Sequence, residues 1–157
     1  MLFCCQMTSY IRITANKQLF HKKYIEDKYA GKRITGCRTA QEVVHDQLAD
    51  LDHEEVWLIH LTAANNVIAA EMIAMGTLTE TSVDCRTVLR SALLQNAACF
   101  VIAHNHPSGE PRPSVSDIKF TVQLKKACDL MDIKLLDHIV LSSKSFFSFA
   151  EEQTLNY

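Results

Sequence analysis

The chain has 157 residues, a length typical of one domain. Hydrophobic residues make up 48% of the sequence, so the chain can bury a sizeable core without disulfides or a structural metal. The formal net charge of −2 gives no sign of the basic surface that a general nucleic-acid binder carries, and we expect no strong nucleic-acid binding.

The cysteines and the lack of targeting patterns indicate where in the cell the protein is located. Six cysteines occur, and no two are spaced as Cys-x-x-Cys, which excludes a zinc ribbon and a thioredoxin-like motif. Unpaired cysteines are typical of a reducing cytosol. The apolar start, residues 1–5, is too short for a signal-peptide core, and no stretch approaches the length of a membrane span. We therefore expect a cytoplasmic protein that makes no contact with a membrane.

The N-terminal region is the least informative part of the chain. Residues 1–37 carry no recognisable chemistry, and we interpret them as an N-terminal extension of unknown function before a domain at residues 38–157. Thr39 and Glu42 fit a capping box with Thr39 as the N-cap, which predicts a helix from Thr39 to about Ala49.

Two strands and a second helix are predicted next. Apolar residues at 56–61 and 67–74 flank the turn-forming pair Asn65-Asn66, a pattern typical of two paired strands. Asp84 can then cap a helix, because apolar residues follow it at helical spacing.

The C-terminal half continues the alternation of strands and helices. The apolar run at 98–103 predicts a central strand, and a helix should run from Ser114 to about Met131. Residues 133–141 and 146–149 predict two more strands. The fold class is therefore α/β with a mixed central sheet, or α+β if the first strand pair is antiparallel.

Three possible metal ligands lie close together in the sequence. His104 and His106 follow the predicted central strand, and Asp117 comes eleven residues later. A hydrolytic zinc site uses three ligands drawn from His, Asp, Glu and Cys, and leaves a fourth position for water. The sequence therefore predicts a zinc site made of His104, His106 and Asp117.

Simpler roles exist for the same residues. A single histidine at a strand end is more often packed than ligating, although two histidines one residue apart can turn both rings toward one metal ion. Ser114 and Asp117 could merely cap the start of the helix. Asp117, however, begins the inward stripe of that helix, and an inward carboxylate is costly unless it is paired or bound to metal. That stripe is expected to contain Phe120, Leu124, Ala127, Cys128 and Met131.

Glu71 is a carboxylate in the middle of an otherwise apolar strand. With period-two alternation it shares a face with Val67, Ala69 and Ile73. It could form a buried pair with a basic residue, or mark an edge strand. It could also be the general base of a hydrolytic reaction.

These residues, in this order, resemble the JAMM/MPN+ metalloprotease family. The family pattern is an early glutamate, then His-x-His-Pro, six residues, Ser, two residues and Asp, which Glu71, His104, His106, Ser114 and Asp117 match in spacing. The surrounding sequence is closer still to the RadC-like JAB-domain branch. Similar segments are Met75-Gly76-Thr77-Leu78, Asn96-Ala97-Ala98, Ala103 to Gly109, and Leu136-Asp137-His138-Ile139-Val140.

The resemblance covers about residues 39–149 and implies a fold, a cofactor and a reaction. It implies a cytidine-deaminase-like JAB/MPN core, with Zn²⁺ held by His104, His106 and Asp117. It implies Glu71 as the base that takes the proton of the attacking water, and Ser114 as a donor to the oxyanion. The expected function is hydrolysis of an amide bond, peptide or isopeptide, in a peptide or protein substrate.

Functions other than hydrolysis make different demands on the sequence. A nucleobase deaminase would need His-x-Glu and Pro-Cys-x-x-Cys, which the sequence lacks. A DNA-associated role, suggested by the repair label of the RadC-like branch, and a non-catalytic interaction module are both compatible with the sequence. For His138, a packed histidine or one that supports a ligand is favoured over a fourth ligand.

Overall fold

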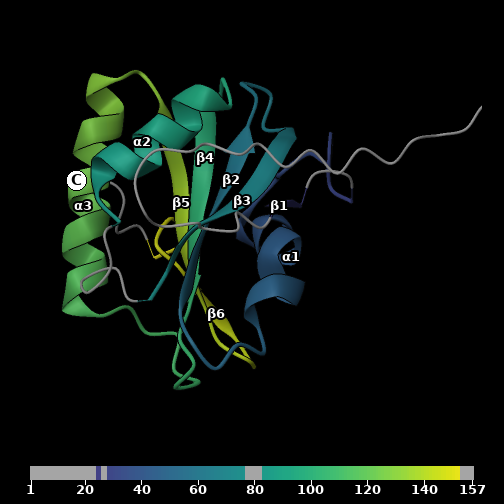
Figure 1. Cartoon of the computed structure of the whole chain (residues 1–157), viewed down its shortest axis with the longest axis vertical. Coiled ribbons are helices and arrows are strands. Elements are labelled where there is room, and N and C mark those ends of the chain that lie inside the picture. Colours follow the sequence, from purple (N-terminus) through teal and green to yellow (C-terminus); the bar gives the residue numbers. More distant parts are fainter. Residues whose placement is uncertain (1–23, 26–27, 77–82, 153–157) are drawn as a thin grey trace, which may run out of the picture.

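The described part of the chain, residues 24–25, 28–76 and 83–152 of a computed structural model, contains a six-stranded mixed sheet (Figure 1). Strands β4 and β5 run parallel, whereas every other neighbouring pair is antiparallel. This architecture confirms the predicted mixed α/β class. In sheet order the strands are β1 (Tyr24–Ile25), β3 (Val67–Met75), β2 (Glu55–Leu61), β4 (Cys99–Asn105), β5 (Lys134–Leu141) and β6 (Phe146–Ser148).

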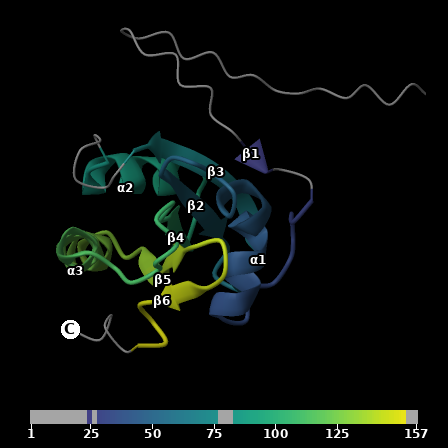
Figure 2. The same ribbon diagram turned by 90° about the horizontal axis from the view of Figure 1, so that it is seen from below.

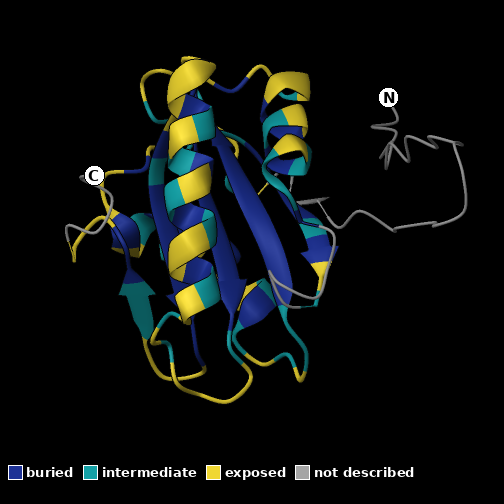
Figure 3. Ribbon diagram, turned by 90° about the vertical axis from the view of Figure 1, so that its left-hand side faces the viewer, coloured by how far each residue is buried: buried dark blue, intermediate teal, exposed yellow. Residues whose placement is uncertain are grey.

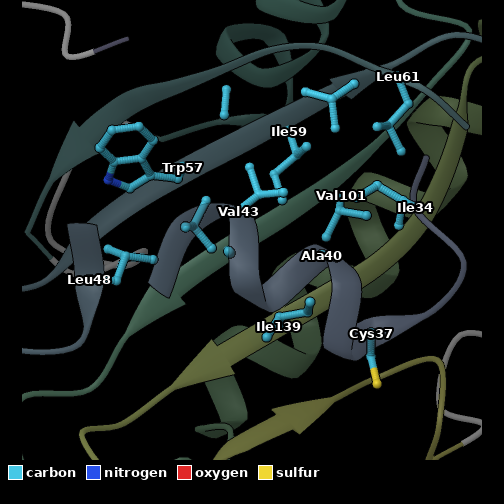
Figure 4. Close-up of a cluster of buried hydrophobic side chains, with 14 of the residues drawn as sticks. Ile34, Cys37, Ala40, Val43, Leu48, Trp57, Ile59, Leu61, Val101 and Ile139 are labelled. Carbon is cyan, nitrogen blue, oxygen red and sulfur yellow. The ribbon is translucent and has the colours of Figure 1, made fainter. Parts of the chain in front are cut away.

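Helices cover both faces of the sheet and divide the core in two. Helix α1 (Cys37–Leu48) lies on one face, and α2 (Cys85–Leu94) and α3 (Val115–Leu130) lie on the other (Figure 2). The α1 side buries a cluster that includes Val43, Trp57 and Ile139 (Figure 4). The α2/α3 side buries a second cluster around Phe100 and Leu124. None of the described helices has the length and apolar character needed to cross a membrane.

Helix α1 begins earlier than predicted, so the expected cap at Thr39 is wrong. Gly36 is the N-cap, and Thr39 occupies the third helical position. The Thr39 hydroxyl oxygen accepts hydrogen bonds from the backbone N–H groups of Thr35 and Gly36, at 2.9 and 3.1 Å. The threonine thus supplies the N3 half of a capping box from inside the helix, and the Gly36 N-cap has no side chain to supply the other half.

Strand β3 does not keep the simple alternation expected of it. Its register with β2 shifts between Val56 and Trp57 and again between His60 and Leu61. Val67 therefore packs in the α1-side cluster, and the expectation that it shares a face with Glu71 is wrong. Each irregularity adds an unpaired residue and exchanges the two faces of the strand.

The buried stripe of α3 also differs in part from the predicted one. Leu124 and Cys128 are buried as expected, but Met131 is 47% exposed at the end of the helix. Thr121 takes a buried position instead, although its polar side chain gave no apolar signal. Figure 3 shows the exposed outer side of α3 standing in front of buried strands.

Part of the region interpreted as an N-terminal extension contacts the domain. Strand β1 pairs with β3 at Ala70 and Glu71. Ile34 is buried in the α1-side cluster, and the backbone of Arg33 forms an isolated antiparallel β-bridge with Asn66. The alternating residues Tyr10 to Thr14 also predict a strand, and they lie outside the described part of the chain.

The N-cap of α2 provides a test of this local structure. The Asp84 carboxylate accepts a hydrogen bond of 2.8 Å from the backbone N–H of Thr87. That bond, together with Arg86, lowers the pKa of Asp84 from 3.8 to about 2. We expect Asp84→Ala to lower the free energy of unfolding by about 1 kcal/mol at pH 7, and Asp84→Asn by much less.

The contribution of Asp84 has a defined pH dependence. Because its pKa is depressed in the folded state, the stabilisation is complete above about pH 4 and is lost as the pH falls through about 2. Urea unfolding of both variants at pH 7 and pH 3 measures this. Equal losses of stability in the Ala and Asn variants would contradict the capping role.

Candidate metal centre

The end of strand β4 delivers the two histidines. His104 is 1% exposed and lies opposite Val56 of β2 and Val140 of β5. The backbone N–H of His106 donates to the carbonyl of Leu141 at 2.8 Å, which continues the contact with β5 past the end of the strand. Both histidines are therefore held by the centre of the sheet and not by a free loop.

The residue between the histidines clamps the strand end. The Asn105 side chain accepts a hydrogen bond from Glu55 N and donates one to His53 O, both at 2.8 Å. It is 2% exposed, so these bonds are shielded from water. Asn105 thus ties the start of β2 to the end of β4, and the sequence analysis assigned it no such function.

The N-terminus of α3 places Asp117. Ser114 is the N-cap; its oxygen accepts from Asp117 N, and its hydroxyl donates to Asp117 Oδ2 at 2.6 Å. Asp117 Oδ2 also accepts from Ser114 N at 2.7 Å. The capping interpretation is therefore confirmed, and it fixes the orientation of the carboxylate.

The side chains of His104, His106 and Asp117 converge on one point. Their possible ligand atoms all lie within 4.8 Å of one another. His104 Nε2 is 3.1 Å from His106 Nε2 and 3.6 Å from Asp117 Oδ1, and His106 Nε2 is 3.6 Å from Asp117 Oδ2. A tetrahedral zinc ion with bonds of about 2.0–2.1 Å separates its donor atoms by about 3.4 Å. The three residues therefore fit the predicted ligand set.

Hydrogen bonding leaves His106 prepared to act as a ligand. His106 Nδ1 lies 2.9 Å from the carbonyl oxygen of Glu110, which can only accept a hydrogen bond. Nδ1 therefore carries the proton, and in the neutral ring Nε2 keeps its lone pair. The turn from His106 to Gly109 brings the Glu110 carbonyl back to the His106 ring. In this turn Gly109 N donates to His106 O, and the φ of 84° at residue 109 favours glycine.

The electrostatics of the cluster are those of an electron-rich site. Burial lowers the pKa of His104 to about 4, against the opposing effect of the Asp117 charge. Contact with Asp117 raises the pKa of His106. Burial alone would raise the pKa of Asp117, but His106, His104 and Ser114 together hold it well below its usual range. A carboxylate and two imidazole nitrogens at this spacing would attract a cation.

Glu71 lies on the same face of the sheet as His104, but its hydrogen bonds go to residues outside the cluster of possible ligands. It is 1% exposed, and its Oε1 lies 3.0 Å from His60 Nε2 and accepts a hydrogen bond from Ser91 Oγ. Glu71 pairs with Leu58, which pairs with Ile102, two residues before His104. The buried pair with a basic residue, considered from the sequence, is therefore present, and it involves His60.

Two more buried residues lie behind His104. His138 of β5 has its Nε2 2.8 Å from His104 Nδ1, which agrees with the expectation that it packs or supports a ligand. Thr121 of α3, in contact with His138, was not predicted. The only sequence signal for Thr121 was its position four residues after Asp117, one turn further along the same helix. The position of His138 depends on the β4–β5 register, which no local pattern encodes.

Comparison with known proteins identifies the family. A model of the RadC-like JAB domain matches residues 34–154. The UPF0758 protein YeeS of Escherichia coli is 41% identical over 125 residues, which cover 80% of this chain and 84% of that protein. UPF0758 proteins of Thiobacillus denitrificans and Flavobacterium johnsoniae are 37% and 33% identical over 142 residues. Each alignment covers 90% of this chain, but only 63% and 62% of the two relatives.

The chain therefore belongs to the RadC-like JAB domain family, as the resemblance predicted. Within this family domain, the His104–His106–Asp117 cluster is a possible metal site. The chain spans less than two thirds of the length of two of the relatives it matches.

The buried contacts of Glu71 lead to a prediction about stability. Glu71→Ala removes the acceptor for His60 and Ser91, and an unpaired buried donor costs about 1–3 kcal/mol. Glu71→Gln keeps an accepting oxygen in place. We expect Glu71→Ala to reduce the free energy of unfolding by at least that amount and Glu71→Gln to reduce it much less, as measured by urea denaturation. Similar stabilities for the two variants would show that the hydrogen bonds do not hold this part of the sheet.

Proposed function

We propose that this chain is a zinc-dependent hydrolase that cleaves amide bonds, peptide or isopeptide, in a peptide or protein substrate. The observation that carries the proposal is the clustering of His104, His106 and Asp117: the two Nε2 atoms are 3.1 Å apart, and a different carboxylate oxygen of Asp117 lies 3.6 Å from each of them. That spacing suits a tetrahedral ion with three protein ligands and an open fourth position. Membership of the RadC-like JAB domain family agrees with it.

The proposed reaction divides the work between the metal and the protein. When bound, zinc supplies Lewis acidity, which lowers the pKa of water to about 7 and polarises a carbonyl oxygen. His104 is held on the sheet and Asp117 on the helix start, so the ligand geometry does not depend on a flexible segment. Glu71 takes the proton of the attacking water and transfers it to the amine that leaves when the C–N bond breaks.

Glu71 must move to perform this role. Strands about 4.8 Å apart with a rise of about 3.4 Å per residue place the Cα atoms of Glu71 and His104 about 12 Å apart. The carboxylate is bonded to His60, which pairs with Phe100 and so lies further from the His104 end of β4. In the proposal the Glu71 side chain turns from His60 and Ser91 toward His104 when substrate and water are in place.

Ser114 has a second possible role besides its cap. Its hydroxyl proton is donated to Asp117 Oδ2, one of the proposed ligand atoms. In the proposal this hydroxyl redirects its hydrogen bond to the oxyanion that develops on the scissile carbonyl. Its position at the exposed start of α3 leaves room for a substrate to approach.

A cavity beside His106 can receive part of a substrate. It has a volume of about 230 Å³ and is bordered by His106, Pro107, Asn105 and Ser142, and on its other side by the end of α1. A larger cavity of about 390 Å³ is bordered by Arg33, Cys37 and Asp137 and includes none of the three proposed ligands. The smaller cavity, which His106 alone of the three proposed ligands borders, is the one we assign to the substrate.

Zinc content is the first measurement that tests the proposal. We expect one zinc ion per chain after dialysis against a zinc-containing buffer and removal of the excess. His106→Ala should lose zinc while the fold persists, because the two hydrophobic clusters do not include this residue. His45→Ala, on the exposed face of α1, is the matched control and should keep the metal. No zinc in the wild-type protein would overturn the proposal.

The role of Glu71 gives a second test. Glu71→Gln cannot accept the proton of the attacking water, so turnover should fall about 10²–10⁴-fold. Zinc content should stay at the wild-type value, because Glu71 is not among the clustered ligand atoms. Zinc analysis and hydrolysis of a quenched fluorescent peptide library, with isopeptide-linked members, measure both effects on the same preparations.

The outcomes separate the possible roles of the glutamate. Loss of zinc in Glu71→Gln would make it a ligand, whereas full activity would place the base elsewhere. Stoichiometric zinc without turnover of any library member by the wild-type protein would contradict the hydrolase and leave a metal-binding interaction module.

A further inference from the structure

His138 lies in the second layer behind the proposed metal ligands. It is fully buried and pairs with Ile102 in the parallel β4–β5 ladder. Its Nε2 is 2.8 Å from His104 Nδ1, and its Nδ1 is 2.6 Å from Thr121 Oγ1. Both ring nitrogens are therefore engaged on the side of His104 that faces away from His106 and Asp117, and His138 is not a fourth ligand.

The backbone of α3 fixes the single proton of Thr121. Thr121 Oγ1 lies 2.6 Å from the carbonyl oxygen of Asp117, one turn earlier in the helix. A carbonyl oxygen can only accept, so the hydroxyl proton must lie on this bond. Bonding of threonine to the carbonyl four residues earlier is a common local arrangement in helices. The Thr121 oxygen is then left only as an acceptor for its other neighbour, His138.

The position of the Thr121 proton determines which atom donates in the Thr121–His138 and His138–His104 hydrogen bonds. Since Thr121 accepts, His138 Nδ1 must donate and carries a hydrogen. A neutral His138 ring then has a lone pair on Nε2, which can only accept, so His104 Nδ1 must donate to it. A neutral His104 ring in turn keeps a lone pair on Nε2, the atom that lies 3.6 Å from Asp117 Oδ1. Because both histidines are almost fully buried, a second proton on either ring would place a charge in the core.

Packing holds this chain of hydrogen bonds in place. The Phe149 ring stacks on His138 with 4.8 Å between centroids and 7° between planes, and Phe149 N donates to His138 O at 3.0 Å. Thr121 and Leu124 are buried on the same side of α3. The His138 ring therefore has little freedom to rotate.

We infer that His138 and Thr121 are positioning residues that hold His104 in the tautomer with a free Nε2 lone pair, so that the metal site is prepared before metal binds. The inference rests on the proposed function in one respect, that His104 is a metal ligand. It goes beyond that function because neither His138 nor Thr121 belongs to the motif on which the proposal depends. Hydrogen-bond partners of ligating histidines typically change metal affinity 10–100-fold when they are removed.

The first measurement needs no metal. Long-range ¹H–¹⁵N correlation spectra of the zinc-free protein show which ring nitrogen of each histidine carries the proton. We expect His104 and His138 both to be protonated at Nδ1. In Thr121→Val, which keeps the side-chain volume but lacks the hydroxyl, His138 should lose its fixed tautomer and His104 should become a mixture. Thr121→Ser, which keeps the hydroxyl, should resemble the wild-type protein.

The second measurement is zinc affinity by competition with a chelator. His138→Phe keeps an aromatic ring against Phe149 but removes the acceptor, and we expect its Kd for zinc to rise about 10–100-fold. His138→Gln can accept from His104 and donate to Thr121 through one amide group, so it should restore the Kd to within a few-fold of wild type. The Thr121→Val and Thr121→Ser pair provides the same comparison if His138→Phe does not fold.

The possible failures are distinguishable. An Nε2-protonated His104 in the zinc-free wild-type protein would overturn the inference whatever the metal does. An unchanged Kd in both His138→Phe and Thr121→Val would also overturn it. If the wild-type protein bound no zinc, the proposed function would fail, and the tautomer spectra alone would decide whether His138 orients His104.

Discussion

The parallel pairing of β4 with β5 is the constraint on which the site depends. Parallel strands cannot be joined by a tight turn, so the chain must cross over, and it does so through α3 on one face of the sheet. The crossover lays the start of α3 beside the end of β4, where His104 and Asp117 meet. The same pairing sets His138 next to Ile102 and gives His106 N the carbonyl of Leu141.

Several side chains at the site have a structural and a chemical use at once. Asp117 completes the cap of α3 through Oδ2, while its Oδ1 faces His104. Thr121 bonds within its helix and also fixes the ring of His138. Such residues tie the chemistry to the folding of the helix, since a change in the cap also moves a possible ligand. In β5 the structural and the chemical use fall to neighbouring residues. Asp137 binds Ser148 and Ala150 and so has the structural use, whereas His138 faces α3 and the proposed site.

The sequence predicted most of the fold and the three residues that cluster, because both depend on local patterns. Hydrophobic periodicity located the strands and helices, and Asp84 and Ser114 were found as caps from their residue types. The expected cap at Thr39 was wrong because a threonine at the N-cap and one three residues later look alike in sequence. Val67 was assigned to the wrong face because β-bulges are set by tertiary pairing.

The partners of the supporting residues could not be predicted for a similar reason, although His138 was expected to pack or to support a ligand. Asn105 was interpreted only as the spacer in His-x-His, and its bonds to Glu55 and His53 depend on how β2 meets β4. The link between His138 and His104 spans 34 residues and requires the register of a parallel ladder. The contact of Glu71 with His60 joins the neighbouring strands β3 and β2. The sequence therefore offered a buried basic partner as one option but could not say which residue it is.

The described cysteines, three buried and Cys85 partly exposed, affect how far zinc binding stabilises the fold. Burial raises the pKa of Cys37 to about 11 and that of Cys128 to about 12, and it also raises the pKa of Cys85 and Cys99. These four thiols therefore remain protonated at neutral pH in the folded protein and are poor metal ligands. Unfolding exposes them as soft donors, so zinc would bind the unfolded chain as well. Thermal stabilisation by added zinc would then understate the affinity of the native site.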